Sequence, residues 1–127
     1  MKRWAAGVLL LLLPLTLAPR TSWELGDGWR ADVAVDRVQG ATSGVNPLVF
    51  AVIPPQTSWT TTAVRVSITS SGTWALVSAS PGCQRIGDVV SCTLVNSGPY
   101  RQRVIRLAVR ALGGGALSYS LSKAATV

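Results

Sequence analysis

The stretch TTTAVRVSIT, residues 60–69, is the clearest guide to the fold of this 127-residue chain. Mostly apolar and mostly polar or small side chains alternate along it. The mostly apolar set shares one face: Thr62, Val64, Val66 and Ile68. The other set faces the opposite way: Ala63, Arg65, Ser67 and Thr69. A period of two with many β-branched residues is typical of a half-buried β-strand. We therefore predict a strand with one face in a hydrophobic core and Arg65 on the outside.

Similar short apolar stretches lie on both sides of this strand, separated by Gly, Pro, Asn and Ser clusters. They predict strands over residues 31–36, 48–53, 74–79, 104–109 and 117–122. Residues 103–111 also fit a helix with three arginines on one face, but the β-rich surroundings favour a strand. Many short strands without an internal repeat predict one all-β domain, a single immunoglobulin-like antiparallel β-sandwich.

The stretch CQRIGDVVSC, residues 83–92, predicts a hairpin closed by a disulfide. Gly87-Asp88 between two β-favouring runs is a two-residue turn signal, with Gly first as a type II′ turn prefers. Counting outward from that turn places Cys83 opposite Cys92 at a non-hydrogen-bonded pair, where opposing Cβ atoms come closest. Because the spacing is not Cys-x-x-Cys, we expect a structural disulfide rather than a redox-active pair.

The N-terminus has the layout of a secretory signal. A basic start, Lys2-Arg3, precedes an apolar run over residues 4–18 that is shorter than the about 20 residues of a membrane-spanning helix. Pro19 is poorly placed after a cleavage site, so an uncleaved anchor helix is the alternative. Either way the domain is expected to be exported, to the periplasm, the cell surface or the medium. The chain then divides into a signal or anchor (1–18), an irregular lead-in (19–29) and the sandwich (30–127).

The composition argues against catalytic and metal sites. The chain has no His, which removes the usual general base and the commonest metal ligand. Four of its five acidic residues lie near the N-terminal edge of the domain, and Asp88 belongs to a turn, so no carboxylate pair for glycoside hydrolysis is expected. No acidic spacing matches a calcium loop. We therefore expect no catalytic residue, no metal and no cofactor, and so a protein that is not an enzyme.

The net charge of +7, carried mainly by arginine, favours anionic neighbours. Removal of residues 1–18 would leave +5. If their strands share a sheet, the outward arginines would form one basic face, and loop tryptophans would add flat rings for stacking. The candidate binding surface is Arg65, Arg106, Arg110, Trp59 and Trp29. The alternatives are that the charge keeps the domain soluble, that the arginines prevent edge-to-edge aggregation, and that the tryptophans plug the ends of the sandwich.

Two segments, WALVSASPGC (74–83) and VSCTL (90–94), carry a family resemblance. Together with residues 30–35, 48–53, 104–109 and 124–127 they resemble the bacterial surface-repeat domain of unknown function, eleventh family (DUF eleven). The resemblance covers residues 30–127. It implies an immunoglobulin-like sandwich of exported and cell-surface proteins, in tandem copies and without established enzymatic activity. This chain departs from the pattern by having one copy and by lacking both the Asn-Gly-Pro turn and the Asp-x-Leu-Pro segment.

Two functions follow as expectations. The first is a non-enzymatic structural or interaction module of the cell envelope, such as an accessory subunit of a surface assembly, with an envelope protein or a second copy as partner. The alternative is a small binding module for anionic cell-surface polysaccharide. Nucleic acid is not expected, because no recognised binding fold supports it. Contact with a membrane is expected only through residues 1–18, if these stay uncleaved.

Overall fold

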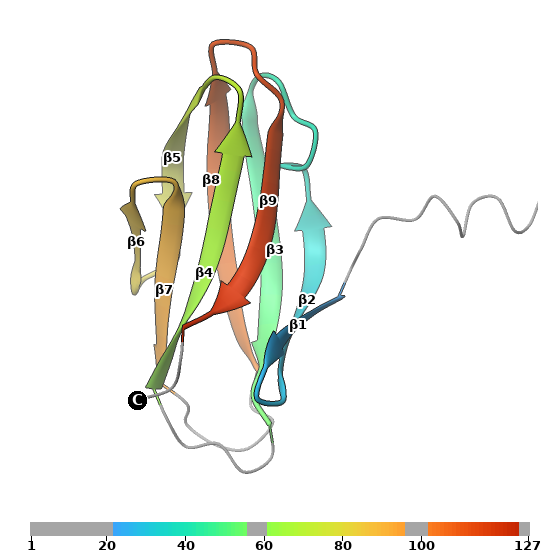
Figure 1. The fold of residues 1–127 in the computed structure, drawn as a ribbon, viewed down its shortest axis with the longest axis vertical. Coiled ribbons are helices and arrows are strands. Elements are labelled where there is room, and N and C mark those ends of the chain that lie inside the picture. The colour runs from blue at the N-terminus through green and yellow to red at the C-terminus, as the bar shows by residue number, and fades with distance from the viewer. Residues whose placement is uncertain (1–21, 56–60, 96–101, 125–127) are drawn as a thin grey trace, which may run out of the picture.

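The computed structural model describes residues 22–55, 61–95 and 102–124, and in these ranges every regular element is a β-strand (Figure 1). The nine strands are β1 (Ser22–Gly26), β2 (Trp29–Asp36), β3 (Val45–Ile53), β4 (Thr61–Ser70), β5 (Thr73–Ala79), β6 (Cys83–Ile86), β7 (Val89–Val95), β8 (Arg103–Leu112) and β9 (Leu117–Lys123). No helix that could cross a membrane occurs in the described part of the chain. The helix expected at residues 1–18 lies outside it.

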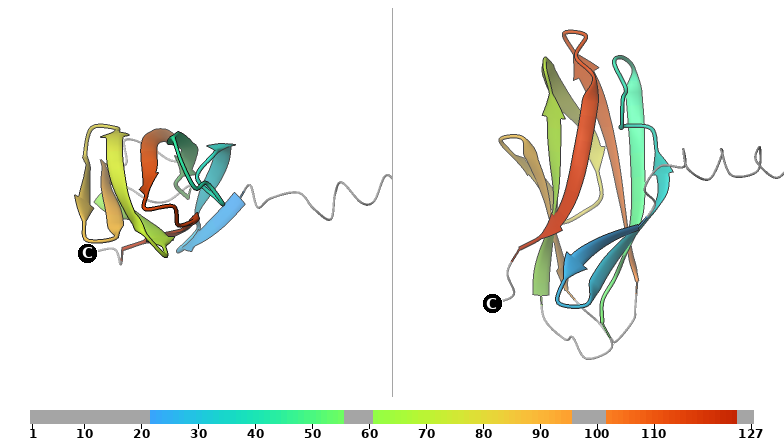
Figure 2. Two further views of the ribbon diagram at one scale, coloured as in Figure 1. Left: turned by 90° about the horizontal axis from the view of Figure 1, so that it is seen from above. Right: turned by 45° about the vertical axis from the view of Figure 1, so that its right-hand side comes forward.

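The strands form two sheets that pack face to face. The five-stranded sheet has the order β1-β2-β3-β8-β5, and the four-stranded sheet has the order β6-β7-β4-β9. All neighbouring strands are antiparallel. Figure 2 shows the two layers from two further directions. The predicted all-β, antiparallel sandwich is therefore confirmed.

The core lies between the sheets and consists of the inward side chains of the alternating strands. Val64 and Val66 of β4 are fully buried, and Phe50 of β3 is the largest of the fully buried side chains. On β8 the burial alternates strictly, with Ile105 inside and Arg106 outside. Burial of each large aliphatic or aromatic side chain contributes about 1.5–3 kcal/mol relative to its exposure. The alternation of apolar and polar residues in the sequence thus correctly predicts which side chains of these strands are buried and which point outward.

The β6–β7 hairpin has the predicted register. Ile86 pairs with Val89 beside the turn, and Cys83 pairs with Cys92, to which it is joined by a disulfide. A type II′ turn requires a positive φ at its first central residue only. Gly87 has a φ of +62°, and the φ of Asp88 is not positive. The predicted disulfide is confirmed.

The expectation of an irregular lead-in over residues 19–29 is wrong for its described part. Residues 22–26 form β1, which pairs with β2 through a bulge between Glu24 and Gly26. The strand is held by tertiary packing: Leu25 is buried, and the Trp23 ring centroid lies 5.8 Å from that of Tyr119 on β9. A five-residue strand with two apolar side chains is too short to stand out by periodicity.

The β1–β2 hairpin and the loop after β2 close one side of the sandwich against β9. Lys123 of β9 forms an ion pair of 3.0 Å with Asp27 in the β1–β2 turn. Gly40 donates a backbone hydrogen bond of 2.7 Å to Leu117, and Leu117 donates one of 2.8 Å to Ala41. These contacts cover part of the outer edge of β9, where an unpaired strand would otherwise invite aggregation.

Candidate functional site

The structure divides the candidate binding residues between two surfaces. Arg65 projects from β4 in the four-stranded sheet, whereas Arg106 and Arg110 project from β8 in the five-stranded sheet. All three side chains point outward, so the arginines lie on opposite faces of the sandwich. The condition for one shared basic face, that these strands belong to the same sheet, is therefore not met.

Of the two tryptophans proposed for stacking, only Trp29 is described by the structure, and it does not add to either surface. Trp29 is 3% exposed and starts β2 as part of the core, so its ring is not accessible to a ligand. Trp59 lies outside the described residues.

The exterior of the five-stranded sheet combines exposed apolar side chains with arginine. Strands β3 and β8 carry ten outward residues, here called the β3–β8 outer face: Val45, Pro47, Val49, Ala51, Ile53, Val104, Arg106, Ala108, Arg110 and Leu112. Cross-strand neighbours set Val49 beside Arg106, and Val45 beside Arg110. Strands β3, β8 and β5 contain no acidic residue. No hydrogen bond or ion pair joins either guanidinium group to a residue that the structure describes.

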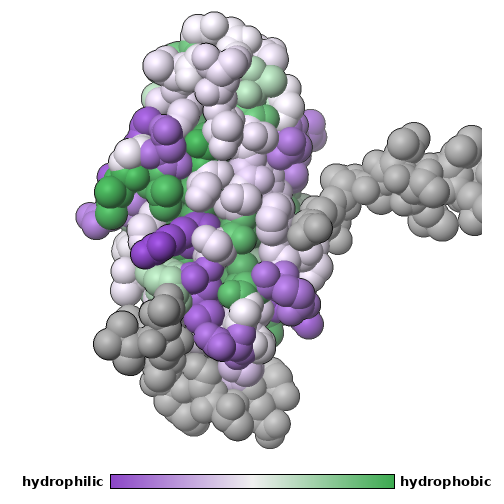
Figure 3. Space-filling model, in the orientation of Figure 1, coloured by the Kyte–Doolittle hydropathy of each residue, from purple (hydrophilic) through white to green (hydrophobic). Residues whose placement is uncertain are grey.

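The exterior of the four-stranded sheet is lined mainly by hydroxyl groups. Arg65 lies between Ser91 on β7 and Ser122 on β9. Beside it, a shallow depression of about 220 Å³ is bounded by Ile86 and Val89, and Ile86 is 59% exposed. Figure 3 shows this face, with a green apolar patch over the β6–β7 hairpin that is bordered by purple hydrophilic and by pale residues. The surface offers one positive charge and hydroxyl groups, which suits an anion but supplies no general base.

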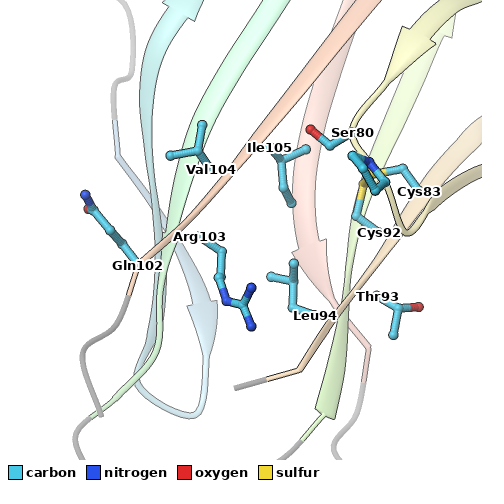
Figure 4. Close-up of a pocket in the computed structure, with 10 residues that line it drawn as sticks. Ser80, Cys83, Cys92, Thr93, Leu94, Gln102, Arg103, Val104 and Ile105 are labelled. Atoms are coloured by element: carbon cyan, nitrogen blue, oxygen red, sulfur yellow. A yellow bond between two sulfur atoms is a disulfide. The ribbon is translucent and has the colours of Figure 1, made fainter. Parts of the chain in front are cut away.

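A larger pocket of about 500 Å³ lies beside the disulfide (Figure 4). Its apolar wall includes Cys92, Leu94 and Ile105, and its polar lining includes Thr93 and Arg103. The described lining residues include no carboxylate, and they offer an apolar wall for packing and one guanidinium group for contact with an anion.

A cluster of three side chains joins the two sheets at the β5 and β6 edges. The Cζ atom of Arg85 lies 3.5 Å from the Trp74 ring centroid, and its Nη1 donates a hydrogen bond of 2.8 Å to the Trp74 carbonyl. The Trp74 indole nitrogen donates to Asp88 over 3.2 Å. Sequence reasoning missed this cluster, having placed Trp74 in a strand and Asp88 in a turn. The only feature of the sequence that pointed to this cluster is the alternation along β6, which places Arg85 on the same inner face as Cys83.

A second cluster surrounds Tyr119 on the opposite side of the sandwich. Its hydroxyl donates a hydrogen bond of 2.9 Å to Asp36. The other oxygen of that carboxylate accepts hydrogen bonds from the backbone of Val38 and Gln39. Burial, followed by the hydrogen bond to and the charge of Asp36, raises the pKa of Tyr119 well above its ordinary value. The arrangement fixes the β2–β3 loop and places no reactive group at the surface.

Among residues 22–55, 61–95 and 102–124 there is no group of three or more His, Cys, Asp or Glu side chains that could hold a metal ion. Fold and surface together define a disulfide-bonded antiparallel β-sandwich with two chemically different exposed faces. Searches of known protein families, of curated proteins and of solved structures found no match to this chain.

Proposed function

We propose that this protein is an exported, non-enzymatic interaction module of the cell envelope, with an immunoglobulin-like sandwich that serves as an accessory subunit of a surface assembly. The observation that carries the proposal is the β3–β8 outer face. Val45 and Leu112 at one end of it and Val104 at the other are 41–46% exposed, and Arg106 and Arg110 project on the same face. Exposed apolar side chains gathered on one face mark an interaction surface more often than scattered ones do.

Two further features support export. A cross-strand disulfide persists in oxidising compartments and is rare in the cytosol. The basic and apolar residues of segment 1–18 fit an export signal. The resemblance of residues 30–127 to the surface-repeat family agrees with the same compartment and with an immunoglobulin-like domain.

Binding of anionic polysaccharide is the second candidate function. The observation that favours it is Arg65, which has no ion pair with any described residue and lies between two serines on the hydroxyl-lined face. A carboxylate or phosphate group on a glycan would accept hydrogen bonds from the guanidinium group, with Ser91 and Ser122 as further donors. Such binding should weaken steeply with salt.

Export is tested first, with the full tagged chain produced in a bacterial host. Cell fractionation with alkylation of free thiols should find the protein outside the cytoplasm with Cys83 and Cys92 oxidised. A matched variant that lacks residues 1–18 should stay in the cytoplasm in its reduced form. Full-length protein found reduced in the cytoplasm would overturn the proposal.

The mode of interaction is tested by affinity capture from intact envelopes, with captured protein and polysaccharide both identified. A stoichiometric protein that needs Arg106 supports the subunit role. Acidic polysaccharide alone, released by salt and lost in the Arg65→Ala variant, would instead favour the glycan-binding role.

A further inference from the structure

The β3–β8 outer face has the shape and charge of one half of a sheet-on-sheet interface. We infer that it packs against a flat apolar face of an acidic partner protein, whose carboxylates pair with Arg106 and Arg110. This inference rests on the proposed function and names the surface and the chemistry of the partner.

The shape of the face permits close approach. Ala108 lies opposite Pro47 in the middle of the face, Ala51 lies opposite Val104 towards one end, and both alanines are half-buried. Ala75 on β5 extends the same surface beside Arg110. Two sheets pack about 10 Å apart when small and branched side chains interdigitate between them. The outward positions of β3 and β8 carry no aromatic side chain, and the larger aliphatic side chains, Ile53 and Leu112, lie at the ends of their strands.

The charges of the face define what the partner must supply. Arg106 and Arg110 are both exposed and point to the same side of β8, four residues and therefore about 13 Å apart along the strand. The nearest carboxylate on the sheet exterior is that of Asp32 on β2, which already pairs with Arg30 over 3.1 Å. Burial of the arginines without partners would be costly, so the partner must bring carboxylates to both positions.

A second copy of the chain and a lipid bilayer both fit the face less well. Two copies joined through this face would bring arginines together without any acidic residue on β3, β5 or β8 to neutralise them. A bilayer would meet few long apolar side chains, since Ala51 and Ala108 are short and half-buried and the two arginines lie on the same face. A flat protein surface can contact such a face over its whole area.

The inference is tested by placing a photo-crosslinking amino acid at Leu112 in the full exported chain, within intact envelopes. The matched control carries it at Thr69, which is exposed on the opposite face of the sandwich. We expect one discrete crosslinked protein from position 112 and none from position 69. Arg106→Glu should reduce this product about tenfold or more, since like charges at an interface cost several kcal/mol. The reciprocal Asp or Glu→Arg change in the identified partner should restore it.

Several results would overturn the inference. These are a crosslink to a second copy of the chain, equal crosslinking from both positions, no crosslink at all, or a product that Arg106→Glu leaves unchanged. Binding of the purified protein to phosphatidylcholine–phosphatidylglycerol vesicles through Arg106 would assign the face to lipid instead. The oxidation state of the two cysteines distinguishes failure of the proposed export from failure of the docking surface. If the protein is exported with its cysteines oxidised but gives no crosslink, only the docking surface is contradicted. Thermal unfolding of the Arg106→Glu variant, compared with Arg65→Glu, confirms that the fold is intact.

Discussion

The guanidinium group of Arg85 stacks on the Trp74 ring with its Cζ atom 3.5 Å from the ring centroid, and it also donates a hydrogen bond to the Trp74 carbonyl. Trp74 lies on β5, an edge strand of the five-stranded sheet, whereas Arg85 belongs to β6, an edge strand of the other sheet. Asp88 accepts a hydrogen bond from the same indole and lies 4.0 Å from the Arg85 guanidinium. One residue pair therefore joins the two sheets and satisfies an edge carbonyl that would otherwise need water.

Arg85→Ala is expected to lower the free energy of unfolding by about 1–3 kcal/mol, because it removes the stacking, the charge-assisted hydrogen bond and the cover over Trp74. Urea unfolding followed by tryptophan fluorescence measures the change. Arg65→Ala is the matched control, since its side chain is exposed and has no described partner, and it should change stability by less than about 0.5 kcal/mol. Equal effects of the two substitutions would contradict a specific role for the Arg85–Trp74 pair.

Structural features that depend only on residues close together in the sequence could be predicted from it. The inward and outward sets of β4 follow from the alternation of Thr62, Val64, Val66 and Ile68, all of which are buried. The pairing of Cys83 with Cys92 follows from the two-residue turn alone. Each of these depends on a fixed period or on one short loop, and therefore needs no knowledge of the rest of the fold.

Features decided by distant parts of the chain could not be predicted in this way. Alternation shows that Arg65 and Arg106 point outward, but it does not show that β4 and β8 belong to different sheets. The strand β1 was missed because its stability depends on Tyr119, which lies near the other end of the domain. The link between Arg85 and Trp74 likewise arises only when the chain passes from one sheet to the other.

Loss of the disulfide is expected to destabilise the domain by about 2–3 kcal/mol, because the bond closes a short loop in the unfolded chain. The Cys83→Ser/Cys92→Ser double variant tests this by urea unfolding. Wild-type protein treated with dithiothreitol should unfold at the same urea concentration as the variant, which separates the loss of the bond from the effect of serine. A variant as stable as the oxidised wild type would show that the hairpin register alone holds β6 in place.

Two aspartates allow a comparison of a covered ion pair with an exposed one. Asp27 pairs with Lys123, whose side chain is only 3% exposed, whereas the side chains of Asp32 and its partner Arg30 are about half exposed. Asp27→Asn removes a carboxylate from the ammonium group of Lys123, which also donates to the Ala124 carbonyl, and should cost about 1–3 kcal/mol. Asp32→Asn should cost less than about 1 kcal/mol. Asparagine tolerates the left-handed backbone of Asp27, where φ is +55°, so the substitution tests charge rather than backbone strain. Equal losses in urea unfolding would contradict the role of burial.

The raised pKa of Tyr119 predicts how stability changes at high pH. Burial and the Asp36 carboxylate keep the phenol protonated in the folded protein above its ordinary pKa of 10.0, whereas the unfolded chain loses the proton near that value. The unfolded state then binds fewer protons than the folded state, so the contribution of Tyr119 is fully present below pH 10 and falls above it. The slope can reach about 1.4 kcal/mol per pH unit.

Tyr119→Phe removes this titration together with the 2.9 Å hydrogen bond to Asp36. At pH 7 the variant should be less stable than the wild type by about 1 kcal/mol, because the carboxylate loses a donor. Above pH 10 the difference should shrink and then reverse, since only the wild type must keep a buried phenol protonated. Urea unfolding of both proteins at pH 7, 10 and 11 measures the difference, and all other titrating groups are common to the two chains. Parallel curves across this range would show that Asp36 and burial do not control the Tyr119 proton.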